Sequence, residues 1–150
     1  MSALATTSPP VTGIDPRGAR FSATVTSVVL ALVLLSPSPV SLILLAVQAA
    51  VFAAGATRGV QRTAYAAVFR GVVRPHVGAP TELEDPRPPR FGQGLGLAFV
   101  GVALVALVLG LTTVGLVSVG LALVAALLNA VFGLCLGCEL YLILRRALPR

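Results

Sequence analysis

Two long stretches of the chain carry no charged residue: one runs from Phe21 to Thr57 and the other from Phe91 to Cys138. Of the 150 residues, 57% are hydrophobic and 11% are charged, whereas a soluble domain has about 25% charged residues. A chain this short cannot bury so much apolar surface in water. The sequence therefore predicts an integral membrane protein. It excludes a soluble enzyme, a disordered chain and, with only two cysteines, a disulfide-stabilised secreted domain.

Each uncharged stretch is long enough for two membrane spans, because about 20 helical residues at about 1.5 Å each cross the roughly 30 Å of hydrocarbon. Asp15 followed by Pro16 is typical of a helix N-terminus. We predict an all-α integral membrane four-helix bundle of two antiparallel hairpins. Its parts are a flexible tail over 1–14, a single membrane domain over 15–150, spans over about 16–35, 39–56, 91–109 and 114–144, and a loop over 57–90. The fourth span is too long for the bilayer without a tilt, a kink or a projecting end, and we expect no cleaved signal peptide.

All eleven basic residues are arginines, and with five acidic residues they give a net charge of +6. They precede the first span, follow the fourth span or lie in the long loop, whereas the connections at 36–39 and 110–113 carry no charge. By the positive-inside rule, this distribution predicts a multi-pass protein of the plasma (inner) membrane, with both termini and the long loop in the cytoplasm. Membrane topology accounts for the basic charge, so we expect no nucleic acid partner.

The first part of the loop has the pattern of a basic amphipathic helix. Arginines recur there at multiples of four residues and would share one side of a helix: Arg58, Arg62, Arg70 and Arg74. The opposite side would carry Val60, Ala64, Val68 and Val72, with Tyr65 close by. We predict a cytoplasmic interfacial helix that ends at Pro75 and contacts lipid headgroups or anions, together with Arg145 and Arg146.

The fourth predicted span contains both cysteines of the chain and the only acidic residue within a span. In one continuous helix, Cys135, Cys138 and Glu139 would lie within about 100° of arc and present two thiols and a carboxyl on one face. An acidic side chain at that depth is a candidate functional group. We therefore predict these three residues as the catalytic site. Polar residues that could pair with Glu139 are Arg145, Arg146, Gln48 and Asn129.

Three interpretations of the cysteine pair are open. The thiols can be small apolar packing groups. They can cycle between dithiol and disulfide, or carry a sulfane sulfur as a persulfide. They can bind a metal, although that needs about four ligands and the remaining candidates are Glu139 and the distant His76. In a regular helix, Cβ atoms at i and i+3 are about 5–6 Å apart, so a disulfide closes only if the helix bends near Gly133 or Gly137.

Other small and polar residues of the spans are expected to serve helix packing. Gly92 with Gly96, and Gly133 with Gly137, have the spacing that lets two helices approach closely. Hydroxyl and amide groups can bond to the backbone or to neighbouring helices. These groups belong to Ser22, Thr24, Thr26, Ser118 and Asn129.

Short blocks throughout the chain resemble one family. The blocks are GIDPRGARF at 13–21, FR at 69–70, VRP at 73–75, ELEDP at 82–86, PRF at 89–91, LNA at 128–130 and FGLCLGCE at 132–139. On these blocks the chain resembles the uncharacterised actinobacterial family DUF4395, from Gly13 to Arg146. The resemblance implies a small membrane protein found in the company of thioredoxin-like and sulfurtransferase proteins, which makes such a cytosolic protein the expected partner.

We expect a membrane protein of thiol or sulfur metabolism. In it, Cys135 and Cys138 would exchange electrons or sulfane sulfur near the cytoplasmic face, while Glu139 relays protons. Two alternatives are open: a structural or assembly subunit whose complex covers the cysteine face, and a carrier of small anions such as sulfur oxyanions. The carrier would work as a homo-oligomer and would need a wide, hydrated cavity that reaches Cys135. No haem, nucleotide or flavin signature is visible, so the sequence specifies no cofactor.

Overall fold

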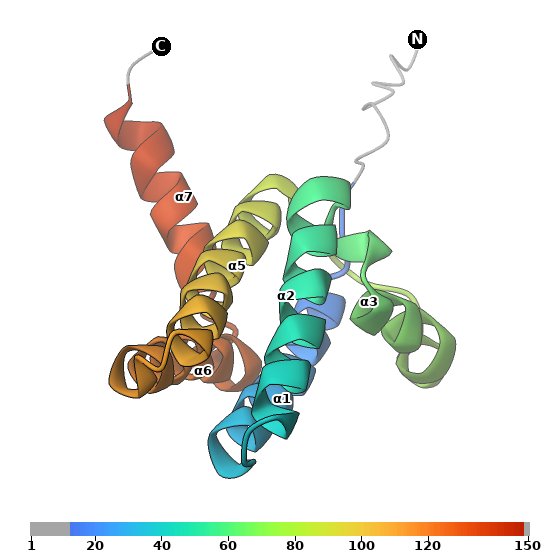
Figure 1. Cartoon of the computed structure of the whole chain (residues 1–150). Coiled ribbons are helices and arrows are strands. Elements are labelled where there is room, and N and C mark those ends of the chain that lie inside the picture. Colours follow the sequence, from blue (N-terminus) through green and yellow to red (C-terminus); the bar gives the residue numbers. More distant parts are fainter. Residues whose placement is uncertain (1–12, 149–150) are drawn as a thin grey trace, which may run out of the picture.

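The computed structural model describes residues 13–148, so residues 1–12 of the predicted tail lie outside the described residues. This part of the chain is helical and contains no β-strand. Four of its helices are long and apolar enough to cross a membrane: α1 (Pro16–Leu35), α2 (Val40–Arg58), α5 (Arg87–Val108) and α6 (Thr112–Phe132) (Figure 1). The protein is therefore an all-α, multi-pass membrane bundle, which confirms the predicted fold class.

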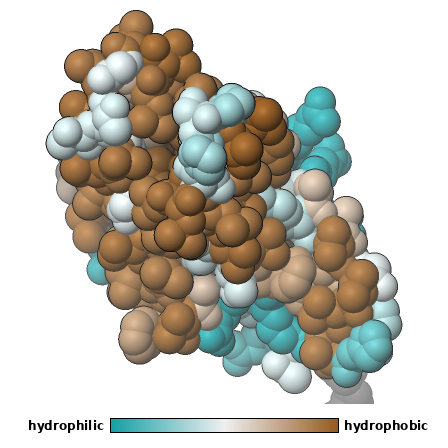
Figure 2. Space-filling model, turned by 60° about the horizontal axis from the view of Figure 1, so that its bottom comes forward, coloured by the Kyte–Doolittle hydropathy of each residue, from teal (hydrophilic) through white to brown (hydrophobic). Residues whose placement is uncertain are grey.

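The four long helices form a closed ring in which each packs against two others: α1 contacts α2 and α6, and α5 contacts the same two helices. Their side chains meet in one core, made of Leu30, Val33, Leu45, Phe52, Val100, Ala103, Val119 and Ala122. Large apolar side chains also stay exposed on the outside; Ile43 is 61% exposed and Val105 is 59% exposed. Hydrophobic residues cover most of the face shown in Figure 2. A helix that is apolar all round is typical of a lipid environment.

Local signals determine where the long helices begin. The Asp15 carboxylate accepts a hydrogen bond from the Arg17 N–H at 3.0 Å and caps α1, and Pro16 takes its first position. α5 begins at Arg87 rather than near residue 91, because Pro88 and Pro89 lie in its first turn, where no backbone donor is needed.

The last residue of the predicted tail belongs to the folded part. Ile14 is 4% exposed and pairs with Glu84 in an isolated β-bridge. Two backbone hydrogen bonds of 2.9 Å join these two residues. The bridge fastens the loop before α5 to the start of α1.

The loop between α2 and α5 does not form the single amphipathic helix predicted from its arginines. Gly59, at φ +101°, turns the chain after α2, and a 3-10 turn, η1 (Val60–Arg62), follows. The helical part comprises α3 (Ala64–Val68), a π-helical turn η2 (Phe69–Val73) and α4 (Arg74–Val77). Ala66 and Phe69 are its buried residues, whereas Val68 and Val72 are 49% and 60% exposed. The prediction of one helix was wrong because the regular arginine spacing on which it relied extends across the break at Gly59.

The prediction that Pro75 ends this helix was also wrong, because Pro75 lies within α4, which continues to Val77. A proline inside a helix lacks a donor and clashes with the carbonyl four residues earlier. The π-helical turn η2 directly precedes α4. Its wider hydrogen-bond pattern makes room for the proline ring.

The fourth predicted span, 114–144, is two helices: α6 ends at Phe132, and α7 (Leu136–Ala147) follows after a break. Gly133 adopts the left-handed conformation at φ +68°. Its N–H donates to the Asn129 carbonyl at 3.0 Å, the pattern of an αL helix end. α7 then packs on α5 and stands away from α6 (Figure 1).

Candidate functional site

The two cysteines lie at the start of α7, directly after the break. Cys135 is the N-cap residue, and its Sγ accepts a hydrogen bond from the Cys138 N–H at 3.2 Å. The two sulfurs form a disulfide, with the Cα atoms 5.1 Å apart. Because Cys135 is not inside a regular helix, the spacing that would keep an i and i+3 pair apart does not apply. The bend that a disulfide requires is present at Gly133.

Close packing of α7 on α5 positions the disulfide. A Cβ on Gly137 would overlap the Cα of Gly92, and a Cβ on Gly92 would lie 3.4 Å from the Cys135 Sγ. One further contact continues this interface: the rings of Phe91 and Tyr141 have their centroids 5.7 Å apart. Gly92 and Gly137 thus provide the close helix approach that their spacing predicts. The other two glycines of these motifs act differently: Gly96 faces a phenylalanine ring and Gly133 ends α6.

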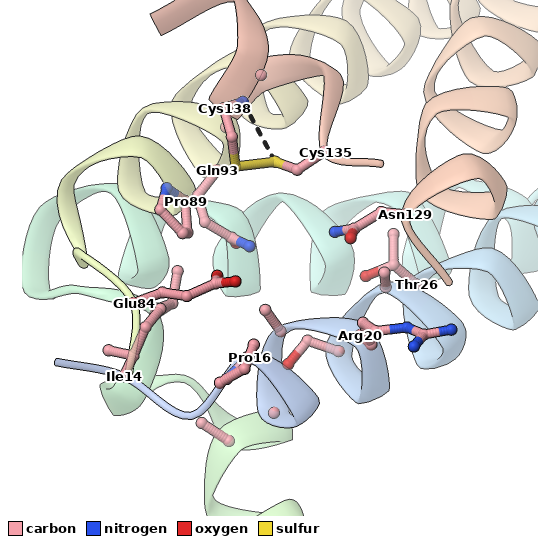
Figure 3. A pocket seen from close by; sticks show the side chains of 18 of the residues that line it. Ile14, Pro16, Arg20, Thr26, Glu84, Pro89, Gln93, Asn129, Cys135 and Cys138 are labelled. Carbon is pink, nitrogen blue, oxygen red and sulfur yellow. Dashed lines mark hydrogen bonds between the residues drawn. A yellow bond between two sulfur atoms is a disulfide. The ribbon is translucent and has the colours of Figure 1, made fainter. Parts of the chain in front are cut away.

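A cavity of about 530 Å³ lies beside the disulfide, and both cysteines line it. It is lined by the first turns of α1 and α5, the last turns of α6 and the start of α7, and the loop before α5 borders it at Glu84 (Figure 3). Its apolar lining includes Ala23, Phe52, Phe99, Ala122 and Ala126. Its polar lining includes Arg20, Thr26, Glu84, Gln93 and Asn129.

Polar side chains reach this cavity from different elements. In Figure 3 the Gln93 amide of α5, the Asn129 amide of α6 and the Glu84 carboxylate point into the space beside the disulfide. The Gln93 Oε1 is buried and has no hydrogen-bond partner among the described residues. This oxygen packs against Gly55 of α2, where a Cβ would lie 2.6 Å from it, so the group that Gln93 presents to the cavity is its amide nitrogen.

Three arginines hold together the end of the bundle where α1 and α5 begin and α2 and α6 finish, which we call the arginine end. Arg20 donates to two carbonyls in the last turn of α6, at 3.2 and 3.1 Å. Arg90 donates to two carbonyls in the last turn of α2, both at 2.6 Å. Arg17 donates to two carbonyls where α4 ends, at 3.0 and 2.9 Å. Cations at helix C-termini satisfy free carbonyls and favour the helix dipole.

Arg17 also holds Asp15 in its charged form. The two side chains form an ion pair at 2.9 Å. Hydrogen bonds from Arg17 lower the pKa of the Asp15 carboxyl below its usual value. One arginine therefore links the cap of α1 to the end of α4.

A buried hydrogen-bond chain docks α3 onto the bundle. Gln48 of α2 is fully buried; its Nε2 donates to the Thr26 Oγ1 at 3.3 Å, and its Oε1 accepts from the Tyr65 hydroxyl at 2.7 Å. Burial raises the pKa of Tyr65, so this hydroxyl keeps its proton. Gln48 therefore serves helix packing and does not meet Glu139.

The structure brings only some of the predicted site residues together. Cys135, Cys138 and Asn129 line the cavity, whereas Glu139 is exposed on α7 and lies outside its lining. All three residues follow the break at Gly133: Cys135 caps α7, and Cys138 and Glu139 lie in its first turn, where Glu139 is exposed. The predicted interfacial arginines are all exposed: Arg58, Arg62, Arg70, Arg74, Arg145 and Arg146.

Two of these arginines have local partners. Arg70 lines the cavity mouth with Arg74 and donates to the Gln61 carbonyl, and the Arg145 guanidinium lies 5.9 Å from the centre of the Tyr141 ring. Within residues 13–148, no three potential metal ligands cluster.

Sequence reasoning missed Glu84, Gln93 and Arg20 as cavity residues. Glu84 reaches the cavity through its β-bridge to Ile14, a long-range contact that leaves no local pattern. The one available signal was Gln93, a lone amide in an otherwise apolar run.

The family model described as "Domain of unknown function (DUF4395)" matches residues 14–146. The chain belongs to this family. The match covers the four long helices, the loop segments and almost all of α7, including both cysteines. No curated protein and no solved structure matches the chain.

Proposed function

We propose that this protein is a membrane-bound thiol–disulfide exchange protein whose reacting centre is the Cys135–Cys138 pair. The observation that carries the proposal is the placement of a bonded, half-buried cysteine pair at a helix N-terminus beside a cavity. Inert packing cysteines need neither the bond nor the cavity. A helix N-terminus stabilises negative charge, which favours the thiolate that such exchange requires.

The exchange would proceed in two balanced steps. A partner thiolate attacks one sulfur of the disulfide, so a mixed disulfide forms while the other sulfur leaves as a thiolate. A second partner thiolate then attacks the mixed disulfide. The partner becomes a disulfide, and the cysteine pair gains two electrons and takes up two protons from water. We assign Cys135 as the sulfur in the mixed disulfide. Its Sγ receives the Cys138 N–H, so the helix end stabilises the Cys135 thiolate, which is the leaving group of the second step and the attacking group of the reverse reaction.

The partner would be cytosolic. The arginine end of the bundle carries the cysteines, and the positive-inside rule places such an end in the cytoplasm of a bacterial plasma membrane. A small thioredoxin-like or sulfurtransferase protein supplies a suitable thiol. The exposed arginines around the cavity mouth, Arg70 and Arg74 among them, would attract an acidic partner surface.

Trapping of the mixed disulfide tests the proposal. In a Cys138→Ser variant, the free Cys135 thiolate attacks a disulfide reagent or the disulfide of an oxidised cytosolic protein and releases a thiol. The mixed disulfide should accumulate, because Cys138 is not present to displace the bound partner. A Cys135→Ser variant is the matched control and should accumulate much less. The proposal is wrong if neither variant forms an adduct at any redox potential and the wild-type pair resists reduction by excess dithiol.

A second candidate is a small-anion carrier, because the cavity reaches Cys135 as a carrier requires. The buried core formed by Leu30, Val100 and Val119 lies beyond the cavity, so transport would require the bundle to open there. Uptake of labelled sulfate or thiosulfate into proteoliposomes, with loss of uptake in an Arg74→Gln variant, would support this function over thiol exchange.

A further inference from the structure

The cavity beside the disulfide contains groups that thiol exchange does not use. Gln93 comes from α5 and Asn129 from α6, and both amides point into the cavity (Figure 3). The Gln93 Oε1 is buried against Gly55 of α2, so Gln93 offers its amide N–H groups to a ligand. The Asn129 amide carries both a donor and an acceptor, so these two side chains suit a neutral ligand with polar atoms at two positions.

The rest of the lining favours a flat, apolar ligand over an anion. Phe52, Phe99 and three alanines form the deep part of the cavity. The carboxylate of Glu84 points into it and would repel an anion. The guanidinium of Arg20 is already bonded to carbonyls of α6, and the two other arginines of the lining, Arg70 and Arg74, are exposed. The volume of about 530 Å³ lies within the range of about 300–1,000 Å³ typical of small-molecule sites.

We propose that this cavity binds a lipid-soluble quinone, which accepts electrons from the Cys135–Cys138 dithiol. The inference rests on the proposed thiol exchange and names its second substrate. A quinone has an apolar ring with two carbonyl oxygens, and the amides of Gln93 and Asn129 can donate to those oxygens. After reduction, the Asn129 amide oxygen can accept from one quinol hydroxyl, and the oxygen of the other hydroxyl can still accept from the Gln93 amide, so the site fits both redox states.

The step balances without another reactant. The two thiols lose two electrons and two protons, and the S–S bond forms. The quinone gains the two electrons and two protons, and both carbonyl oxygens become hydroxyls. Together with exchange at the cytoplasmic face, this step would pass electrons from a cytosolic thiol protein into the membrane quinone pool.

The test uses the full chain in lipid nanodiscs, reduced to the dithiol and kept free of oxygen. A short-chain benzoquinone with a fully substituted ring is added, because such a ring does not undergo thiol addition. Disulfide formation is followed by maleimide labelling, and quinol formation is followed by absorbance. The expected result is one quinol per disulfide formed. Gln93→Leu and Asn129→Leu should each slow this oxidation about five- to tenfold, which corresponds to the loss of about one hydrogen bond.

Two controls separate this inference from the proposed function. Thr24→Val removes a hydroxyl on an exposed position of α1 outside the cavity lining and should leave quinone oxidation unchanged. The exchange rate with a water-soluble dithiol should stay within about twofold of wild type in both amide variants. If the dithiol exchanges with soluble thiols but quinone leaves it reduced, or if both amide variants match wild type, the quinone inference is overturned while the exchange function stands. If soluble thiols do not exchange either, the proposed function falls as well.

Discussion

Replacing Gly133 with alanine is expected to destabilise the disulfide form of the cysteine pair relative to the dithiol. Gly133 holds the left-handed conformation that separates α6 from α7, at φ +68°. An L-residue in this conformation costs roughly 1–2 kcal/mol. The nearest atom to a Cβ at this position is the Arg20 Cδ at 3.8 Å, an ordinary contact. The cost therefore arises from the backbone and not from a clash.

The reduced protein can avoid the left-handed conformation at residue 133 and its cost, whereas the disulfide form cannot. Without the S–S bond, α6 can continue through residue 133, where alanine is a better helix former than glycine by about 1 kcal/mol. In that continuous helix, the Cβ atoms of Cys135 and Cys138 would be about 5–6 Å apart, too far for a disulfide. The two terms together favour the dithiol by about 2–3 kcal/mol. For a two-electron couple, this raises the midpoint potential by about 40–65 mV.

A redox titration in dithiol buffers, read by a maleimide gel shift, measures this change. Gly120→Ala is the matched control, because it is the same substitution in α6 with open space around the new Cβ. Its midpoint should stay within about 10 mV of wild type. A Gly133→Ala midpoint that also stays within this range would refute the claim that the break at Gly133 controls the cysteine pair.

Three other perturbations test the contacts around the site. Tyr65→Phe removes the hydroxyl that donates to the Gln48 Oε1 at 2.7 Å. Loss of this hydrogen bond costs about 1 kcal/mol, so α3 should undock about five times more often and trypsin should cleave the loop faster. An unchanged rate of trypsin cleavage would contradict this. Gly137→Ala places a Cβ against the Gly92 backbone and should lower the free energy of unfolding by about 1–3 kcal/mol. A thermal unfolding midpoint equal to that of wild type would disprove this. The pKa of Asp15 is lowered in the folded protein, so the charged carboxylate stabilises the fold at a pH above its unfolded-state pKa. This stabilisation is lost as the pH falls through the lower pKa of the folded state. Pepsin cleavage of the loop should therefore rise with acid in wild type but not in Asp15→Asn, and an equal rise in both would count against the ion pair.

The parts of the fold that the sequence predicted depend on local signals. The charge-free runs identify the long helices, and Asp15 with Pro16 places the start of α1 at the residue where the structure has it. Each of these signals acts through neighbouring residues or through contact with lipid. They therefore work without knowledge of tertiary contacts.

The break at Gly133 could not be predicted because its cause is not local. The chain has 15 glycines, and this one is a helix end because of the bonds from Arg20 to α6, the packing of Gly137 on Gly92 and the disulfide that follows it. The same applies to the cavity, whose lining joins residues from α1, α5, α6, α7 and the loop. The exposure of Glu139 could not be predicted either, because the packing of α7 on α5 decides which side of α7 faces the cavity.

The redox state of the native cysteine pair is the most direct test of the account. Membranes are isolated with rapid acid quenching, before and after the cells are treated with a thiol oxidant or a reductant, and the peptide around Cys135 and Cys138 is examined by mass spectrometry. A cysteine pair that exchanges electrons should show a mass difference of two hydrogens that appears and disappears with the treatment. Two thiols that stay reduced throughout, or a disulfide that no reductant reaches in the folded protein, would contradict the account.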